Sequence, residues 1–364
     1  MKQLNKQKMI DLLYGCTVLG TGGGGNLTEG IDMLKEAFEE GKELKLISLD
    51  EIPDDAYVAT PYGCGAPSEE GAEIAEEYKD LPQIGYPSSM LAYKKLEEYF
   101  QKDFYAISAT ELGGLNTAEA LNIALSLDLP LIDGDPAGRS VPELQHTTYF
   151  VKDIPIYPMA VATDFGDVVI IENAVDDFRA EKIVRAIAVA SGDIVGVADH
   201  PILGKDIKGA VIEGSISYAL KIGEALRLAK ENKEDVPAAV AKAGGGKVVF
   251  KGDLEKSPWE SRDGFNYGEI HLTGKDEYNG NKYEIWFKNE NIMGYLNDEV
   301  HVTAPDLICM LDKDGEPLCT PNFEEGMEIT IVVLPSPKIW QTEKGIECFG
   351  PRHFGFDMDY KPFF

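Results

Sequence analysis

The sequence predicts an α/β protein, with an N-terminal domain built on a mostly parallel sheet and a C-terminal domain rich in β-strands with some helices. In the first 150 residues, short apolar runs alternate with amphipathic stretches, and this alternation favours a parallel sheet with helices on its faces. From residue 247 onward, apolar segments are separated by Gly, Asn, Asp and Pro, which is typical of strands joined by turns. We expect the domains to comprise residues 1–165 and 166–364, and we expect the C-terminal tail to return and cover a site in the first domain.

The elements expected in the first domain follow in chain order. Helices are expected over residues 6–16 and 28–40, on either side of a glycine-rich segment. Asn116 and Glu119 have the spacing of a helix N-cap and its capping partner, which places a further helix start at residue 116. The remaining helices are expected over 68–78, 88–100 and 116–127, and the strands over 44–49, 57–60, 104–109 and 129–132.

In the second domain the alternation weakens. Two strands are expected over 168–172 and 194–198, with helices over 177–191 and 215–232. The apolar segments beyond them predict strands over 247–250, 265–272, 282–287, 307–311 and 328–334.

Charge and composition exclude several functions. The chain carries 34 Lys and Arg against 63 Asp and Glu, for a formal net charge of −29. Nucleic acids are bound first through neutralising Lys and Arg, so we expect no nucleic-acid partner. No apolar run approaches the roughly 20 residues that a bilayer requires, and no secretory signal is visible, so we expect a cytoplasmic protein without membrane contact. Five cysteines without a CxxC pair predict reduced thiols.

The segment after the first helix contains Gly22, Gly23, Gly24 and Gly25 in succession. Consecutive glycines let backbone N–H groups converge on an anion or a developing oxyanion. No Gly-Lys-Ser/Thr follows, and the segment follows a helix rather than a strand, so no nucleotide is expected. The alternative is a flexible connector, but four glycines cost conformational entropy, which favours a binding loop.

Two further segments place polar groups after predicted strands. Cys64 lies between two glycines before a predicted helix, where the pKa of a thiol can be depressed and the thiolate can serve as a nucleophile. A small residue that fits a tight turn explains Cys64 equally well. Glu111 can act as a base or bind a substrate N–H, and Asn116 either binds substrate or only caps its helix.

The densest cluster lies in residues 132–146 and contains Asp133, Asp135, Arg139, Glu143 and His146. The two aspartates can converge where the chain turns, and there they can hold a divalent metal or serve as a general base and its orienting partner. Arg139 offers a fixed fork for a substrate carboxylate. Its alternative role is to neutralise the aspartates in a structural network.

Two weaker candidates lie in the second half. His200 follows a predicted strand and is a candidate metal ligand or acid, although a lone histidine is more often structural. Arg352 lies in a tail segment rich in Gly, Pro and aromatic residues. In so acidic a chain, Arg139 and Arg352 are the residues expected to let an anionic substrate approach.

These motifs in combination resemble the bacterial family of S-methyl thiohydantoin desulfurase, also described as hydantoinase-like. The resemblance covers nearly the whole chain and is carried by residues 19–25, 111–114, 133–135, 138–139, 142–144, 350–352 and 354–355. It implies an N-terminal α/β domain, a C-terminal β-rich domain and hydrolysis at a five-membered thiohydantoin or hydantoin ring. Water would attack the ring carbon that bears sulfur, a thiol such as methanethiol would leave, and a hydantoin would form, as part of the breakdown of ergothioneine-type compounds.

For this reaction we expect Asp133 or Asp135 to activate water directly or through a metal, while the glycine loop donates N–H groups to the ring. Arg139 would bind an acidic group of the substrate, and His146, Glu143 or Cys64 would protonate the leaving group. Two alternatives are a small-molecule binding or regulatory protein, and ATP-assisted ring opening as in oxoprolinase-like proteins. The absence of a phosphate loop with Lys argues against the ATP version. A homo-oligomer is expected because closed homo-oligomers are common.

Overall fold

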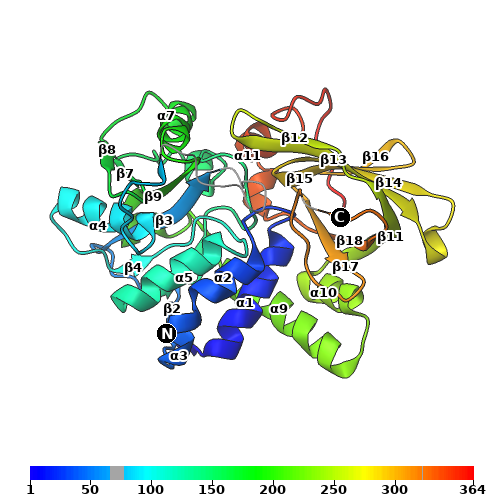
Figure 1. Cartoon of the computed structure of the whole chain (residues 1–364), viewed down its shortest axis with the longest axis horizontal. Coiled ribbons are helices and arrows are strands. Elements are labelled where there is room, and N and C mark those ends of the chain that lie inside the picture. Colours follow the sequence, from blue (N-terminus) through cyan, green and yellow to red (C-terminus); the bar gives the residue numbers. More distant parts are fainter. Residues whose placement is uncertain (66–77, 322) are drawn as a thin grey trace.

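The computed structural model of the chain describes residues 1–65, 78–321 and 323–364. It confirms the predicted fold class, because a mixed sheet with helices on its faces is followed by an antiparallel sheet (Figure 1). The helix expected over 68–78 lies almost entirely outside the described residues. None of the helices in the described ranges is both long and apolar enough to cross a membrane.

The first sheet, sheet A, has eight strands in the order β1-β2-β5-β4-β3-β9-β7-β8. Strands β2, β5, β4 and β3 run parallel, and the remaining pairings are antiparallel. The carboxyl ends of β3, β4 and β5 therefore meet at one edge of the sheet, where open α/β sheets place their ligands. The strands are β1 (Lys2–Leu4), β2 (Leu44–Ile47), β3 (Tyr57–Gly65), β4 (Ala106–Ile107), β5 (Leu131–Ile132), β7 (Met159–Ala162), β8 (Val168–Ile171) and β9 (Ile194–Leu203).

Strands β8 and β9 follow residue 165, where the sequence predicts the domain boundary, and both pair within sheet A. Strand β9 lies antiparallel to β3 over most of its length. A short two-stranded sheet joins β6 (Gly134–Asp135) to β10 (Ile212–Glu213). The second large sheet begins only at Lys247.

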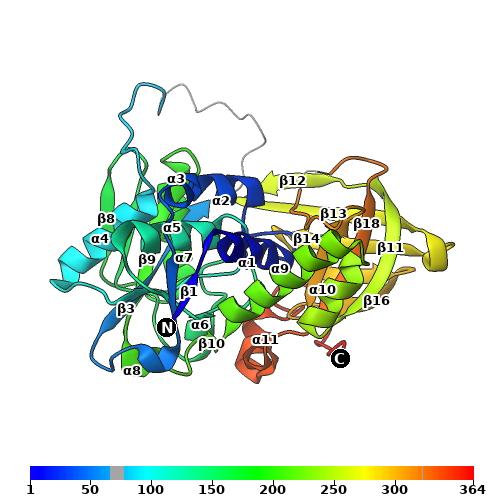
Figure 2. The ribbon, with the colours of Figure 1, turned by 90° about the horizontal axis from the view of Figure 1, so that it is seen from below.

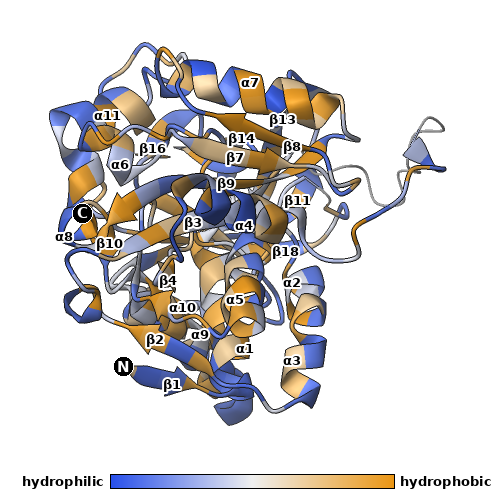
Figure 3. Cartoon of the chain, turned by 90° about the vertical axis from the view of Figure 1, so that its left-hand side faces the viewer, coloured by the Kyte–Doolittle hydropathy of each residue, from blue (hydrophilic) through white to orange (hydrophobic). Residues whose placement is uncertain are grey.

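The helices of the chain cover sheet A and fill the space between the two large sheets (Figures 1 and 2). Apolar residues of α1 and α9 belong to one core that continues into α10 and the last strands of the second sheet. In Figure 3, helix α7 carries both hydrophobic and hydrophilic residues, as expected for a helix with one buried face. The helices are α1 (Lys6–Leu19), α2 (Leu27–Met33), α3 (Lys35–Glu39), α4 (Ser88–Phe100), α5 (Asn116–Leu127), α6 (Thr148–Val151), α7 (Asp177–Val189), α8 (Gly204–Ile207), α9 (Ser215–Asn232), α10 (Val236–Gly244) and α11 (Glu343–Phe349).

Sheet C is antiparallel, in the order β16-β15-β14-β13-β11-β18-β17, with β12 paired to β13. One face buries aromatic and branched residues such as Phe250, Ile285 and Ile331. Its strands are β11 (Lys247–Lys256), β12 (Trp259–Arg262), β13 (Phe265–Gly274), β14 (Lys282–Lys288), β15 (Glu290–Leu296), β16 (Glu299–Thr303), β17 (Leu307–Asp312) and β18 (Glu328–Leu334).

Three local expectations from the sequence are corrected. The helix expected over 28–40 is divided at Leu34 into α2 and α3. The capping pair is wrong, because Leu115 occupies the N-cap of α5 and no side chain caps this helix. The sequence analysis does not predict strands β15 and β16, and within β15 Asn291 and Gly294 interrupt the apolar alternation.

Candidate functional site

The candidate site lies at a seam between the two large sheets. One side is the loop 136–147, which follows β6, and the other is the turn between β14 and β15. Arg139 donates to the backbone oxygen of Asn291, and the hydroxyl group of Ser140 is hydrogen-bonded to the carboxyl group of Glu290. Glu143 forms an ion pair with Lys288. As the loop advances along the chain its contacts move back along the turn, so the two segments run in opposite directions.

A buried carboxyl pair occupies the middle of this seam. The hydroxyl group of Ser140 lies 2.9 Å from Oε2 of Glu111 and 3.0 Å from Oε1 of Glu290. A hydroxyl group has only one proton, so it donates to one carboxylate and must accept from the other group. One member of the pair therefore carries a proton. We call Glu111, Ser140 and Glu290 the acid pair with its bridging serine.

The surroundings of the two carboxyl groups affect their pKa values differently. Burial and the nearby charge of Glu111 raise the pKa of Glu290 to about 8, and the charge of Arg139 only partly opposes this. Burial also raises the pKa of Glu111, but hydrogen bonds from Asn116, Val141 and Ser140 favour its ionised form. At neutral pH the proton therefore resides on Glu290, and Glu111 is the carboxylate. Pairs of titratable groups driven apart in this way mark acid and base assignments in active sites.

The predicted glycine loop lies against the acid pair. A Cβ atom on Gly23 would lie 1.9 Å from Oε1 of Glu290, and one on Gly24 would lie 2.4 Å from Cα of Gly113. Close approach, rather than flexibility alone, therefore requires glycine here. The carbonyl of Gly22 accepts from the backbone N–H of Thr320 at 2.8 Å, and within the described residues the N–H groups of Gly24 and Gly25 have no partner.

Asn116 joins this group from the start of α5. Its Nδ2 donates to Oε1 of Glu111 at 2.6 Å, and its Oδ1 accepts from the backbone N–H of Gly63 at 3.2 Å. The predicted candidates Glu111, Asn116 and the glycine loop are thus brought together.

The side chain of Arg139 is completely buried, and its guanidinium group forms hydrogen bonds with other groups of the protein. Its guanidinium donates to Oγ1 of Thr21 at 2.7 Å and to the backbone oxygen of Pro305 at 3.1 Å. It also lies over the ring of Phe349, 4.8 Å from the ring centroid. Burial lowers the pKa of Arg139 to about 10, so the group stays charged at neutral pH. The structure therefore shows Arg139 joining the two halves of the chain.

Arg352 lies on the surface, with 59% of its side chain exposed. It pairs with Asp357 at 2.7 Å and Asp359 at 2.9 Å, both in the same tail. The two arginines that the sequence associates with an anionic substrate are therefore not brought together.

The two aspartates of the predicted metal or base site serve different parts of the fold. Asp133 accepts from the backbone N–H of Ser217 at 2.8 Å and from its hydroxyl group, and so caps the start of α9. Asp135 accepts from the N–H groups of Ala137 and Gly138, and burial raises its pKa to about 6. Among the described residues, the clusters of potential metal ligands do not include Asp133, Asp135 or His200.

His200 lies in a separate buried group on sheet A. Its backbone is left-handed, with φ of 43°. Its Nδ1 lies 2.8 Å from Oδ1 of Asp199, and its ring stacks on Tyr149 with centroids 4.3 Å apart. Tyr62 donates to the other oxygen of Asp199 at 2.6 Å. Burial raises the pKa of Tyr149, the residue stacked on His200, and the negative charge of Asp135 adds to this effect.

Cys64 lies inside strand β3 rather than in a loop before a helix. It packs in an apolar cluster with Val195 and Val197, and its side chain is buried. Burial raises the pKa of the Cys64 thiol to about 12, so the thiolate is scarcely populated at neutral pH. This environment is typical of an inert structural cysteine.

We therefore predict that Cys64 resists alkylation in the native protein. Iodoacetamide at pH 7.5 should leave the peptide that contains Cys64 unmodified over hours, because both the thiolate form and access are lacking. Peptide mass spectrometry measures this, and the same protein in denaturant is the control that must be labelled. Rapid labelling of Cys64 in the native protein would restore it as a nucleophile.

A second cluster of titratable groups lies at the end of the seam. Nε2 of His146 and Nε2 of His353 face each other at 2.9 Å, so one ring donates and the other accepts. Glu143 contacts Lys288 and lies 3.9 Å from His353. Burial lowers the pKa of His146 well below its usual value, which keeps the ring neutral. We call Glu143, His146 and His353 the histidine cluster.

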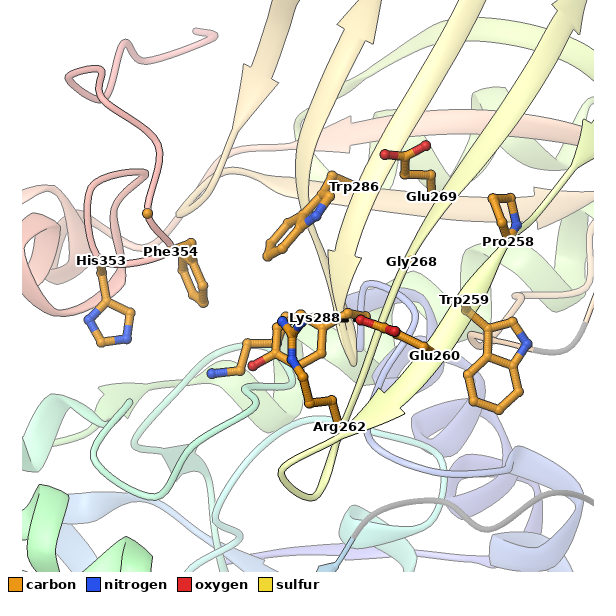
Figure 4. A pocket seen from close by; sticks show the side chains of 12 residues that line it. Pro258, Trp259, Glu260, Arg262, Gly268, Glu269, Trp286, Lys288, His353 and Phe354 are labelled. Carbon is orange, nitrogen blue, oxygen red and sulfur yellow. Dashed lines mark hydrogen bonds and ion pairs between the residues drawn. The ribbon is translucent and has the colours of Figure 1, made fainter.

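The histidine cluster borders an open groove of about 740 Å³ on sheet C. Figure 4 shows Trp259 and Arg262 on β12, Trp286 and Lys288 on β14, and His353 with Phe354 on the tail. Glu260 and Glu269 also line the groove, and Arg262 and Lys288 each pair with a carboxylate, so the aromatic rings suit a planar ligand and the charges of the lining balance. The tail thus reaches the seam through His353, whereas Arg352 is exposed and pairs with acidic residues of the tail itself.

Sequence reasoning missed three residues that complete these clusters. Ser140 and His353 lie inside segments that the motifs single out, but neither was assigned a role. Glu290 was missed entirely, because its local sequence Lys288-Asn289-Glu290-Asn291 is typical of an ordinary turn. Only its burial, with 2% of the residue exposed, distinguishes it from other acidic turn residues.

Comparisons with known proteins agree with this architecture. A family model described as "S-Me-THD-like, N-terminal domain" matches residues 7–173, and one described as "S-Me-THD-like, C-terminal domain" matches residues 175–363. A crystal structure of a protein from Chromobacterium violaceum is similar over 100% of both chains, with a TM-score of 0.78 and 21% sequence identity. At this identity the likeness concerns the fold. No curated protein matches the chain.

Proposed function

Because the chain belongs to the S-Me-THD-like family, that of S-methyl thiohydantoin desulfurase, we propose that it hydrolyses a five-membered thiohydantoin or hydantoin-like ring. The simplest such reaction is desulfuration of an S-methyl thiohydantoin. Water adds to the ring carbon that bears sulfur, the C–S bond breaks, methanethiol leaves, and the carbon becomes the carbonyl of a hydantoin. This extends the reaction that the family name describes to the present chain.

The observation that carries the proposal is that the buried carboxyl groups of Glu111 and Glu290 lie 2.9 and 3.0 Å from the one hydroxyl group of Ser140, so that one of them must be protonated. Hydrolysis of this kind needs a base to take a proton from water and an acid to protonate the departing group or the ring nitrogen. A passive binding site has no need of a buried carboxylic acid that stays protonated at neutral pH. Such a group costs stability whenever it ionises.

In this mechanism Glu111 is the general base and Glu290 is the general acid. After one turnover Glu111 carries the proton and Glu290 is ionised. The Ser140 hydroxyl bonds to both groups, so it can pass one proton to Glu290 while it receives one from Glu111. The bridge thereby restores the starting state without exchange with bulk water.

In this proposal the glycine loop and the groove bind the substrate. The N–H groups of Gly24 and Gly25 donate to the ring oxygen or nitrogen on which negative charge develops. An anionic substituent on the ring replaces Glu143 at Lys288 or Glu260 at Arg262 in the groove. The guanidinium of Arg139 is buried among protein groups and is not open to the groove. The proposed substrate is therefore a small planar ring with an acidic side chain.

A thiol-release assay tests the proposal. The protein is incubated with a panel of S-methyl thiohydantoins and hydantoins that differ in their side chain, with and without chelator, and thiol and ring products are quantified. We expect release of one thiol per hydantoin formed, with acidic side chains preferred. No turnover on the whole panel, together with tight binding of one member by calorimetry, would instead identify a small-molecule binding protein.

A further inference from the structure

The histidine cluster meets the requirements of a metal site that is distinct from the acid pair. It brings together two imidazole rings and one carboxylate from two distant parts of the chain. Their ligand atoms all lie within 4.8 Å of one another. Glu143 and His146 are three residues apart in loop 136–147, and His353 comes from the tail after α11.

Local backbone structure directs these side chains to one point. The N–H of His146 donates to the carbonyl of Glu143 at 3.0 Å, a turn that brings the two residues to one side of the loop. In the tail, the N–H of His353 donates to the carbonyl of Gly350 at 3.1 Å. These turns bring Nε2 of one histidine to face Nε2 of the other at 2.9 Å.

The spacing of the ligand atoms suits a small cation. Two ligands at the usual Zn–N distance in a tetrahedral site are about 3.3 Å apart, so the imidazoles need to separate by only a few tenths of an ångström. The carboxylate of Glu143 lies 3.9 Å from Nε2 of His353, within easy reach of the same ion. Phe349 and Phe354 pack against the ring of His146, with centroids 4.9 and 5.8 Å away, and form an apolar wall that restrains it.

We propose that Glu143, His146 and His353 form a Zn²⁺ site that fastens the C-terminal tail to the first domain. Two imidazoles and one carboxylate are a common set of three protein ligands for zinc, and the fourth position is then open. His353 lines the groove, so the open position faces it and can accept an anionic group of a ligand. Lys288 contacts Glu143 and competes with the ion for this carboxylate. The site does not depend on the proposed hydrolysis.

Zinc titration of the full-length protein tests the site without any activity measurement. Chelator-treated, dialysed protein is titrated with Zn²⁺ in a calorimeter, and we expect one tight site per chain. His353→Ala should weaken binding at least tenfold, because it removes one of three ligands. Co²⁺ should give the intense visible bands of a four-coordinate site in the wild type and not in His353→Ala.

His271→Ala is the matched control. His271 lies between Glu269 and Glu284 on the face of sheet C, in the other described cluster that could hold a metal ion. The control should keep the tight site. Absence of tight binding in the wild type, loss of it in His271→Ala, or unchanged binding in His353→Ala would each overturn the proposal.

Lys288→Met provides an independent test that does not remove a ligand. It frees the Glu143 carboxylate from its competing ammonium group, so Zn²⁺ should bind severalfold more tightly than to the wild type. Unchanged or weaker binding in a folded Lys288→Met protein would contradict the assignment of Glu143 as a ligand. This variant decides the question if His353→Ala fails to fold.

Discussion

Glu290→Gln is expected to lower kcat for thiol release by about 10² to 10⁴-fold while the protein remains folded. Glutamine has the shape of the protonated acid and can keep a hydrogen bond with Ser140, but it has no proton to give to the departing group. The rate of the wild-type enzyme should fall as the pH rises through about 8, where Glu290 ionises. The rate of the variant should not fall over this pH range. Steady-state kinetics between pH 6 and 10 measure both effects.

The same substitution should change how stability depends on pH. The folded protein keeps the Glu290 proton up to about pH 8, whereas the unfolded chain loses it near its ordinary value of 4.5. Between these values the folded state binds more protons, so the free energy of unfolding falls as the pH rises, by up to about 1.4 kcal/mol per pH unit. The loss is complete above about pH 8. Glu290→Gln removes this contribution.

Glu328→Gln is the control for both measurements. Glu328 is an acidic residue of sheet C that pairs with Lys251 and Lys275 near the surface. It should leave kcat within about twofold and the pH dependence of stability nearly unchanged. A Glu290→Gln protein with wild-type kcat would remove Glu290 as the general acid, whatever its effect on stability.

Arg139→Met is expected to lower the free energy of unfolding by about 3 to 5 kcal/mol. The substitution leaves the buried carbonyl of Pro305 and the hydroxyl of Thr21 without their donor, and it removes the positive charge beside Glu290 and Glu111. Urea unfolding followed by tryptophan fluorescence, to which buried Trp340 contributes, measures the change. The loss should appear with or without a ligand.

Arg352→Met is the matched control, because Arg352 pairs only with neighbouring acidic residues of the exposed tail in the part of the chain that is described. Its effect on stability should stay within about 0.5 kcal/mol. If Arg139→Met instead has normal stability but reduced affinity for anionic ligands, Arg139 binds the substrate through its guanidinium group, as the sequence predicts.

Much of the architecture could be predicted from the sequence because the signals are local. Alternating strand and helix patterns identify the first domain, and turn residues between apolar runs identify the strands of sheet C. The four glycines and the segment 132–146 were also recognised as important, and both contact the seam. Where the pattern is interrupted, as at Asn291 and Gly294, strands were missed.

The roles within the site could not be predicted in the same way. Asp133 and Asp135 are conspicuous in sequence, yet Asp133 caps α9 and Asp135 holds a turn. Glu290 is inconspicuous, yet it meets Ser140 from 150 positions away along the chain. A motif indicates that a segment is unusual, but it does not show which of its side chains face one another.

The sequence by itself therefore determined the fold class, the family resemblance and the importance of the glycine loop and of segment 132–146, since these depend on local patterns and on motifs. Only the tertiary structure decided which carboxyl group carries the proton, which arginine is buried, and which histidines face each other. These properties depend on the loss of water and on partners from distant parts of the chain. A pKa is set by that three-dimensional environment, and neighbours in sequence do not define it.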